Sequence, residues 1–274
     1  MATCWRVERT DGRVFGFTSL DQDIVFEGVR YRAETGINPS AISTKSGLQV
    51  DNLEAGGFLD SSAITEDDLR AGVWDHAELR VFAVNWRDLA AGALKLRRGW
   101  LGQVVLKDQQ YSVEVRGLMA ALNAPTGESV TPACAVALGS ARCGADLTDY
   151  TTTGAVTSVS SDRVFDTDLP GATVRLTPTT TGNPPAAYFE GGVITWTTGA
   201  NAGLSMDVRA YAVTGEVGLQ LPMTRAIESG DEFTAVSGCD KSRDTCIAKF
   251  GNLVNFRGFP DLPGIDRIMR IGGQ

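Results

Sequence analysis

Residues 103–117 read QVVLKDQQYSVEVRG, and this stretch decides the fold class of the chain. Two apolar runs, Trp100–Leu106 and Tyr111–Val115, flank the polar residues 107–110. Apolar runs with a period of two on either side of a short polar turn are typical of a β-hairpin. We therefore expect two antiparallel strands here.

The same turn-punctuated pattern extends outward from this hairpin through the N-terminal half. Short runs rich in Val, Ile, Phe and Tyr alternate with Gly and Asp turn signals, as expected of strands. The predicted strands are Arg13–Thr18, Ile24–Phe26, Val29–Ala33, Gly47–Val50 and Glu78–Asn85. Alternation in residues 4–7 also puts Cys4 at an ordinary strand position.

One segment of this half changes to a helical pattern. Residues 61–74 read SSAITEDDLRAGVW, in which Thr65 is followed by three carboxylates. A hydroxyl that can cap the first turn and acidic side chains within that turn favour a helix start. We predict a short helix there, ended by Gly72.

The C-terminal half begins where periodicity is lost, between Pro125 and Asp149. We therefore predict two β-rich domains, residues 1–124 and 125–274, each barrel-like or sandwich-like with short helices. Within the second we expect strands from Thr153 to Val236. The features predicted around them are an exposed loop at 177–187, a helix at Lys241–Phe250 ended by Gly251, and an apolar segment at 252–274 that lies against this domain or a neighbouring subunit.

Composition excludes several classes of protein. The chain has 274 residues, 43% hydrophobic and 21% charged, with a net charge of -8 and a pI near 4.8. An acidic surface repels nucleic acid rather than gripping its phosphates. The first twelve residues carry charges where a signal peptide is apolar, and no run approaches the ~18 apolar residues of a membrane span. We expect a chain made in the host cytoplasm.

Four of the five cysteines fall into two pairs. Eight residues separate Cys134 from Cys143, six separate Cys239 from Cys246, and 95 lie between the pairs. In a reducing cytoplasm such residues are thiols or metal ligands rather than disulfides. The spacing lacks the tight knuckles of zinc sites, and iron–sulfur clusters accept more varied separations. The alternative is four buried thiols that pack as small apolar groups.

The sequence around these cysteines resembles one family. Residues 238–264, GCDKSRDTCIAKFGNLVNFRGFPDLPG, resemble the hallmark of a phage tail-tip (baseplate hub) family that includes the lambda-type minor tail protein L and the hub protein of gene transfer agents. Residues 132–147, PACAVALGSARCGADL, and 191–208, GGVITWTTGANAGLSMDV, are similar to its other motifs. Residues 46–86 are similar to the N-terminal domain of the gene transfer agent version.

The resemblance implies a structural function. It implies a homotrimeric hub at the tail tip of a virion-like particle. The hub would lie between the distal tail protein ring and the distal fibre or receptor-binding protein, with a tail-associated peptidase as a further partner. DNA would pass through a channel that the hub helps to form. It also implies that Cys134, Cys143, Cys239 and Cys246 hold a 4Fe-4S cluster, with structural zinc as the alternative. The C-terminal half would then contain a Cys-ligated centre.

A tail-associated cell-wall hydrolase is the chief rival. His76 is the only histidine, and it lies at the edge of a predicted strand without a nucleophile motif nearby. The acidic pairs Asp67 with Asp68 and Asp231 with Glu232 are adjacent in sequence, which does not give the separation that glycoside hydrolysis needs. We therefore predict a protein that is not an enzyme. An electron-transfer role for a cluster is a third reading, without a flavin or nicotinamide fingerprint to support it.

Overall fold

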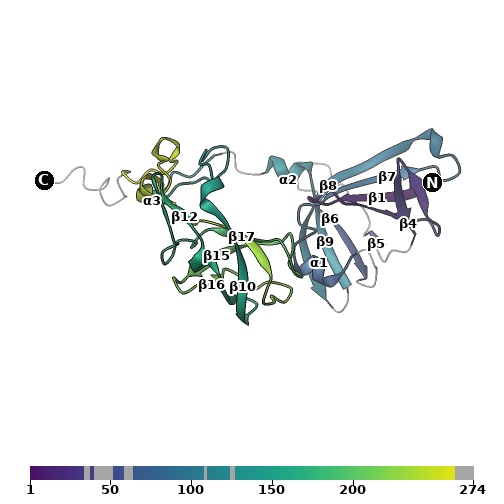
Figure 1. The fold of residues 1–274 in the computed structure, drawn as a ribbon. Helices are drawn as coiled ribbons and strands as arrows, with labels where there is room; N and C mark the ends of the chain where they lie inside the picture. The colour runs from purple at the N-terminus through teal and green to yellow at the C-terminus, as the bar shows by residue number, and fades with distance from the viewer. Residues whose placement is uncertain (34–37, 40–51, 59–63, 108–109, 124–126, 263–274) are drawn as a thin grey trace, which may run out of the picture. The chain divides into compact units, whose positions relative to one another are not determined.

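The structure is a computed structural model. It describes residues 1–33, 38–39, 52–58, 64–107, 110–123 and 127–262 (Figure 1). The chain divides into two compact units, residues 1–126 and 127–274. The domain boundary predicted between residues 124 and 125 falls within the stretch 124–126, which lies outside the described residues.

The described part of the first unit is built on one nine-stranded sheet in the order β3-β4-β2-β1-β7-β8-β9-β6-β5. Neighbouring strands are antiparallel except β2 and β4, which are parallel. The strands are β1 Ala2–Glu8, β2 Val14–Thr18, β3 Ile24–Phe26, β4 Val29–Arg32, β5 Asn38–Pro39, β6 Asn52–Phe58, β7 Glu78–Val84, β8 Ala93–Lys107 and β9 Gln110–Gly117.

Strand β1 gives both faces of this sheet an apolar lining, because successive side chains point to opposite faces. Trp5 and Val7 join one buried cluster, which also takes Leu69 of the helix α1 (Glu66–Arg70). Ala2 and Cys4 join a second cluster, which β3 and β4 close. Cys4, the cysteine outside the two pairs, therefore lies on a strand, as its position in sequence indicated, and its side chain is buried in the core.

The predicted hairpin is confirmed, since Leu106 pairs with Tyr111 and Lys107 with Gln110. Strand β8 begins earlier than predicted because residues 93–99 pair with β7. Strand β6, which was not predicted, pairs with β9. These pairings join residues that are distant in sequence, so no pattern within the strand itself reveals them. The predicted strand Gly47–Val50 lies outside the described residues.

The other local predictions for this unit are confirmed. Strands β2, β3, β4 and β7 lie where the alternation placed them, to within a residue or so at each end. The Thr65 side chain accepts a hydrogen bond of 3.2 Å from the Asp68 amide at the start of α1. Gly72 follows the helix with a φ of 68°. A second short helix, α2 (Leu118–Leu122), was not predicted.

The second unit contains a closed barrel of six strands in the order β10-β11-β16-β15-β14-β17. A mainly β fold with a barrel is therefore confirmed. The barrel strands are β10 Thr151–Ser161, β11 Val164–Thr167, β14 Val193–Trp196, β15 Ser205–Tyr211, β16 Glu216–Leu219 and β17 Glu232–Val236. Gly199–Leu204 forms the turn between β14 and β15.

Aromatic side chains fill the barrel. Phe165, Trp196 and Phe233 are almost fully buried and contact one another in pairs, with ring centroids 5.4–6.1 Å apart. Such offset and edge-on arrangements add to the stabilisation from buried area. The barrel is thus a packed core and not a channel.

Two predictions in this unit need correction. The loop expected at 177–187 contains a strand, because β13 (Thr180–Gly182) pairs with β12 (Val174–Thr177) across a turn in which Thr177 and Thr180 share a hydrogen bond. The helix α3 covers only Arg243–Ala248 and not Lys241–Phe250. Lys241 has a φ of 64°, which is incompatible with a helical residue.

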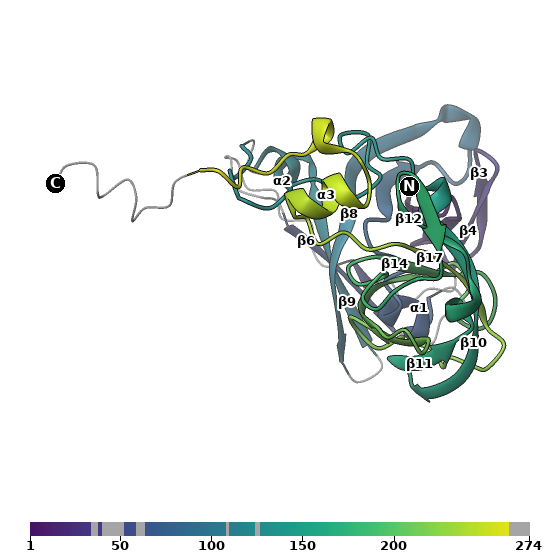
Figure 2. The same ribbon diagram turned by 60° about the vertical axis from the view of Figure 1, so that its left-hand side comes forward.

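The helices of the described residues are all short. None is long and apolar enough to cross a membrane. In both Figure 1 and Figure 2, α3 lies beyond one end of the barrel, together with the chain that follows it.

We predict that Phe233→Ala will lower the free energy of unfolding of the second unit by about 3–5 kcal/mol, because it empties an aromatic site in the core. Hydrogen exchange at the barrel strands β10 to β17 under increasing denaturant measures the change in the second unit separately from the first. Val159→Ala on β10 is the control, since Val159 is 39% exposed and its truncation should cost well under 1 kcal/mol. Equal effects of both changes would contradict this account of the core.

Candidate metal centre

The barrel brings two distant segments of the chain to one place. Strand β10 begins at Thr151 and β17 ends at Val236, and these two residues are partners in the antiparallel ladder. The hydrogen bond from the Ser237 amide to the Tyr150 carbonyl, 2.9 Å long, continues the pairing by one step. Residues 127–150 and 237–262 therefore leave the barrel side by side at the same end.

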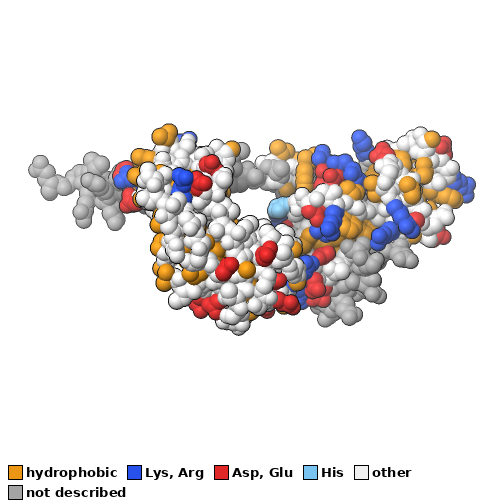
Figure 3. All heavy atoms as spheres, viewed as in Figure 1, with side chains coloured by type: hydrophobic (Ala, Val, Ile, Leu, Met, Phe, Trp, Pro, Cys, Tyr) orange, Lys and Arg blue, Asp and Glu red, His pale blue; other side chains and the backbone are white. Residues whose placement is uncertain are grey.

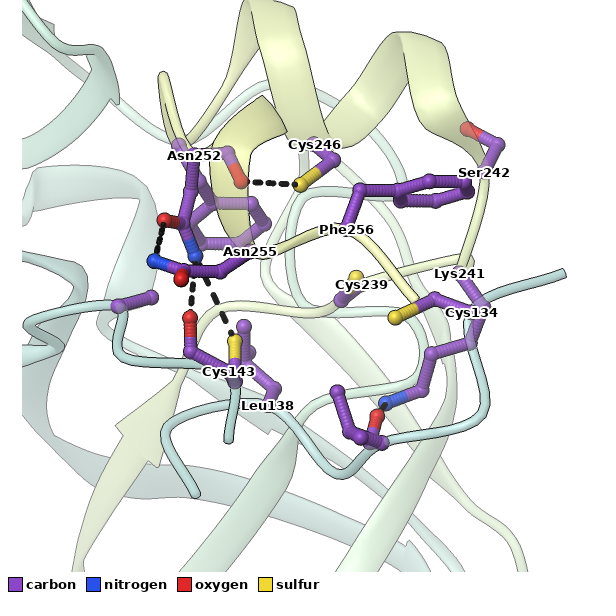
Figure 4. A pocket seen from close by; sticks show the side chains of 13 residues that line it. Cys134, Leu138, Cys143, Cys239, Lys241, Ser242, Cys246, Asn252, Asn255 and Phe256 are labelled. Carbon is purple, nitrogen blue, oxygen red and sulfur yellow. Dashed lines mark hydrogen bonds between the residues drawn. The ribbon is translucent and has the colours of Figure 1, made fainter. Parts of the chain in front are cut away.

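All four paired cysteines line one pocket between these segments (Figure 4). Cys134 and Cys143 come from the irregular segment 127–147, Cys239 follows β17, and Cys246 lies in α3. Their side chains are half-buried free thiols, and Figure 4 shows the sulfur atoms directed into the space between the segments. Apolar side chains complete the wall: Val136, Leu138, Ala145, Phe250 and Phe256.

Backbone hydrogen bonds hold the two segments together. The Cys134 amide donates to the Lys241 carbonyl at 2.9 Å, and the Lys241 ammonium donates back to the Val136 carbonyl at 2.7 Å. Further along, the Phe259 amide donates to the Thr131 carbonyl at 2.8 Å. Gly258 lies so close to the segment around Pro132 that a Cβ at this position would be 2.5 Å from the Pro132 carbonyl oxygen.

Asn252 links the remaining two cysteines. Its side-chain amide donates to the Cys143 carbonyl at 2.6 Å and lies 3.7 Å from the Cys143 sulfur. The backbone carbonyl of Asn252 accepts from the Cys246 thiol at 3.3 Å. Gly144, with a φ of 63°, allows the approach of Asn255, whose amide lies 3.2 Å from the place of a Cβ.

The helix α3 fixes the position of Cys246. The Ser242 side chain caps it by accepting from the Thr245 amide at 3.1 Å. The Cys246 amide makes a helical bond to the Ser242 carbonyl. Gly251 ends the helical segment with a φ of 61°, and its amide donates to the Ile247 carbonyl at 3.0 Å. The predicted C-terminal stop is therefore confirmed.

Lys249 fastens the pocket to the barrel. Its ammonium donates to the carbonyls of Tyr188 and Gly238, at 2.8 and 2.9 Å, and lies 4.0 Å from the centre of the Tyr188 ring. The Tyr150 hydroxyl donates to the Lys249 carbonyl at 2.6 Å. Burial lowers the pKa of Lys249 to about 8. Because Gly238 immediately precedes Cys239, these bonds also fix the position of that cysteine.

The thiols are arranged so that their charges would repel. Burial raises the pKa of the Cys239 and Cys246 thiols. At Cys246 the nearby Cys239, Cys134 and Cys143 raise the pKa further, because several thiolates in one pocket disfavour each other. A cationic centre among them reverses this effect and favours the thiolate form.

Zinc and an iron–sulfur cluster hold their thiolate ligands at different separations. Sulfurs bound to one zinc ion at about 2.3 Å lie about 3.8 Å from each other. Among the described residues, no group of three or more His, Cys, Asp or Glu side chains is gathered in a way that could hold a metal ion. An iron–sulfur cluster binds its thiolates through separate iron atoms and needs a wider cage. Four thiols are donors that either kind of centre takes, but the Cys-ligated centre predicted for the C-terminal half is not shown by the described residues.

The rival candidate residues lie elsewhere. His76 is exposed in a turn with a φ of 58°. Asp67 and Asp68 stand in the first turn of α1, and the Asp231 carboxylate accepts from the Glu228 amide at 3.0 Å. None of these residues lines the cysteine pocket.

Sequence reasoning singled out the four cysteines but missed the residues that position them. Lys241, Lys249 and Asn252 give no signal of their own, because a lysine or asparagine beside a short helix is ordinarily solvated. Only their distance to the cysteines, two or three residues from Cys239 or Cys246 in the case of the lysines, could have drawn attention to them.

We predict that Lys249→Met will lower the free energy of unfolding of the second unit by about 1–3 kcal/mol, because the buried Gly238 carbonyl loses the Lys249 donor and the Tyr188 carbonyl keeps only the Gly238 amide. Hydrogen exchange should show faster exchange at residues 237–241. Arg209→Met, at an exposed position of β15, is the matched control and should leave both quantities unchanged. A variant as stable and as protected as the wild type would show that Lys249 does not fasten this segment.

Comparison with known proteins matches both halves of the chain. Residues 1–146 match the family described as baseplate hub protein, N-terminal attachment domain. Residues 187–266 match the family described as phage conserved hypothetical protein BR0599. The first match includes Cys134 and Cys143, and the second includes Cys239 and Cys246. No curated protein matches the chain.

A solved structure agrees with these matches. A chain in the virion of a native gene transfer agent particle is 36% identical to this one, over 97% of this chain and 89% of that chain, with a TM-score of 0.85. The match of the N-terminal half to a baseplate hub domain and the structural match to a virion chain thus agree with each other. The chain belongs to the baseplate hub family of phage-like and gene transfer agent particles.

Proposed function

We propose that this chain is a structural, non-enzymatic hub that joins the distal tail protein ring to the distal fibre or receptor-binding protein. We further propose that an iron–sulfur cluster on Cys134, Cys143, Cys239 and Cys246 holds its C-terminal unit together. One observation supports the cluster above all others. Four thiols from two segments distant in sequence line one pocket with apolar walls.

Such a centre suits a structural protein that folds in a reducing cytoplasm. When bound, the cluster supplies four iron–thiolate bonds, which cross-link the segments as a disulfide would in an oxidising compartment. A link that closes a loop of about 100 residues restricts the unfolded chain by about 4–5 kcal/mol in the chain-entropy model. The cysteine residues bind the centre, Asn252 orients Cys143 and Cys246, and the apolar side chains exclude water.

We predict that the chain purified without oxygen will absorb visible light through sulfur-to-iron charge transfer and contain about four irons per chain. Cys239→Ser should lose the iron and the absorption, and should unfold at a lower temperature. The control is Cys4→Ala, because Cys4 is buried in the other unit and its removal should leave the iron in place.

The same measurement decides between the kinds of centre. Stoichiometric zinc in place of iron and sulfide would contradict the cluster but keep a metal cross-link. Anaerobic protein without any metal would contradict both and leave four packed thiols.

The proposed assembly is a trimer around a channel that DNA crosses. The net charge of -8 supports passage without binding, because a DNA backbone is repelled by an acidic surface. On the face seen in Figure 3, Asp and Glu side chains outnumber Lys and Arg over the barrel. The trimer, its ring and fibre partners and a tail-associated peptidase are part of this proposal.

We predict that particles from a strain lacking this chain will have no fibre at the tail tip and will be restored by the wild-type gene. His76→Ala should restore them equally well, since a structural hub needs no imidazole. The purified chain should release no soluble fragments from peptidoglycan. Lytic activity that is lost in His76→Ala would overturn the non-enzymatic function in favour of a hydrolase.

A further inference from the structure

A row of three arginines crosses the sheet of the first unit. In the register of β1, β7 and β8, Arg6 is directly opposite Arg80, and Arg80 is directly opposite Arg98. All three therefore lie on the sheet face that carries Cys4 and Phe82. Like charges directly opposite one another destabilise a sheet.

Carboxylates on the neighbouring row compensate only part of this charge. Glu78 is shared by two arginines, with its oxygens 2.5 Å from the Arg80 Nε and 2.7 Å from the Arg98 Nε. Glu8 lies 3.2 Å from Arg6. The hydrogen bond from Arg80, with further contributions from Arg98, holds the pKa of Glu78 at about 2. Three guanidinium groups thus face two carboxylates.

The row forms one side of an open groove of about 630 Å³. Lys95 adds a further positive charge there and makes no ion pair among the described residues, whereas Glu27 is the acidic residue that lines the groove. Leu96, which is 47% exposed, and Phe82 give it an apolar component. Figure 3 shows Lys and Arg side chains gathered on this unit, in a protein that is acidic as a whole.

We propose that this groove binds an acidic segment of another tail protein, whose carboxylates pair with Arg80, Arg98 and Lys95. Planar guanidinium groups suit carboxylates, with which they form bidentate hydrogen bonds. The apolar contribution of Leu96 and Phe82 favours a polypeptide over nucleic acid, and the net charge of the chain repels DNA. The proposal rests on the proposed hub function only for the identity of the partner as a tail protein.

The test uses the full-length chain in assembled particles. A photo-reactive side chain at position 95 should cross-link to a segment rich in Asp and Glu in another tail protein, identified by mass spectrometry. The same group at Arg13, an exposed arginine outside the groove, should not capture that segment. Cross-links to nucleic acid, to a second copy of this chain, or to no tail protein would overturn the proposal.

A second experiment is independent of the particle. The probe is a synthetic 12-residue peptide of alternating Glu and Leu, measured by fluorescence anisotropy against the purified chain. We expect at least tenfold weaker binding to Lys95→Glu with Arg98→Glu, and unchanged binding to Arg13→Glu, with all variants folded as judged by circular dichroism. Absent binding, or equal binding by the double variant, would contradict the groove. A chain that binds the peptide but is absent from particles would instead contradict the hub function.

Discussion

The antiparallel pairing of β10 with β17 is the constraint on which the C-terminal unit depends. Because Thr151 is the partner of Val236, the chain that enters the barrel and the chain that leaves it are neighbours at one end. The thiols of Cys134 and Cys239 can then meet although more than a hundred residues separate them. Every later feature of the pocket, from the Lys241 contacts to the Asn252 contacts, requires this adjacency.

The same arrangement explains why a cross-link is useful there. The two segments have little regular structure, and their apolar side chains are not all buried, since Val254 and Phe259 are 89% and 52% exposed. The described part of the predicted apolar C-terminal segment does lie against its own unit, through the backbone of Arg257 and Phe259. The proposed centre, bonded to four thiols, would give this region a rigidity that burial alone does not provide.

Sequence predicted the features that depend on near neighbours. The β8–β9 hairpin, the Thr65 cap and the Gly251 stop each arise from interactions within a few residues. The early start of β8 and the strand β6 were missed, because they exist only through partners far along the chain. The four cysteines were singled out by their spacing and assigned to one centre by resemblance to a family, whereas Lys249 and Asn252 acquire their roles only in three dimensions. The arginine row could not be seen in sequence, since register alone aligns Arg6, Arg80 and Arg98.

The two units thus carry different parts of the proposed function. The first presents a charged groove on a sheet whose two faces have separate apolar clusters, and surface charge of this kind selects partners and speeds their association. The second provides a packed barrel and, at its end, the thiol pocket.

The central claim of this account is that the hub in a finished particle contains a cluster at this pocket. X-ray absorption at the iron edge of purified, anaerobic particles tests it most directly. The account predicts iron with sulfur ligands and an iron–iron scattering shell, and an amount of iron proportional to the amount of hub protein. Particles that contain the hub without iron would contradict it.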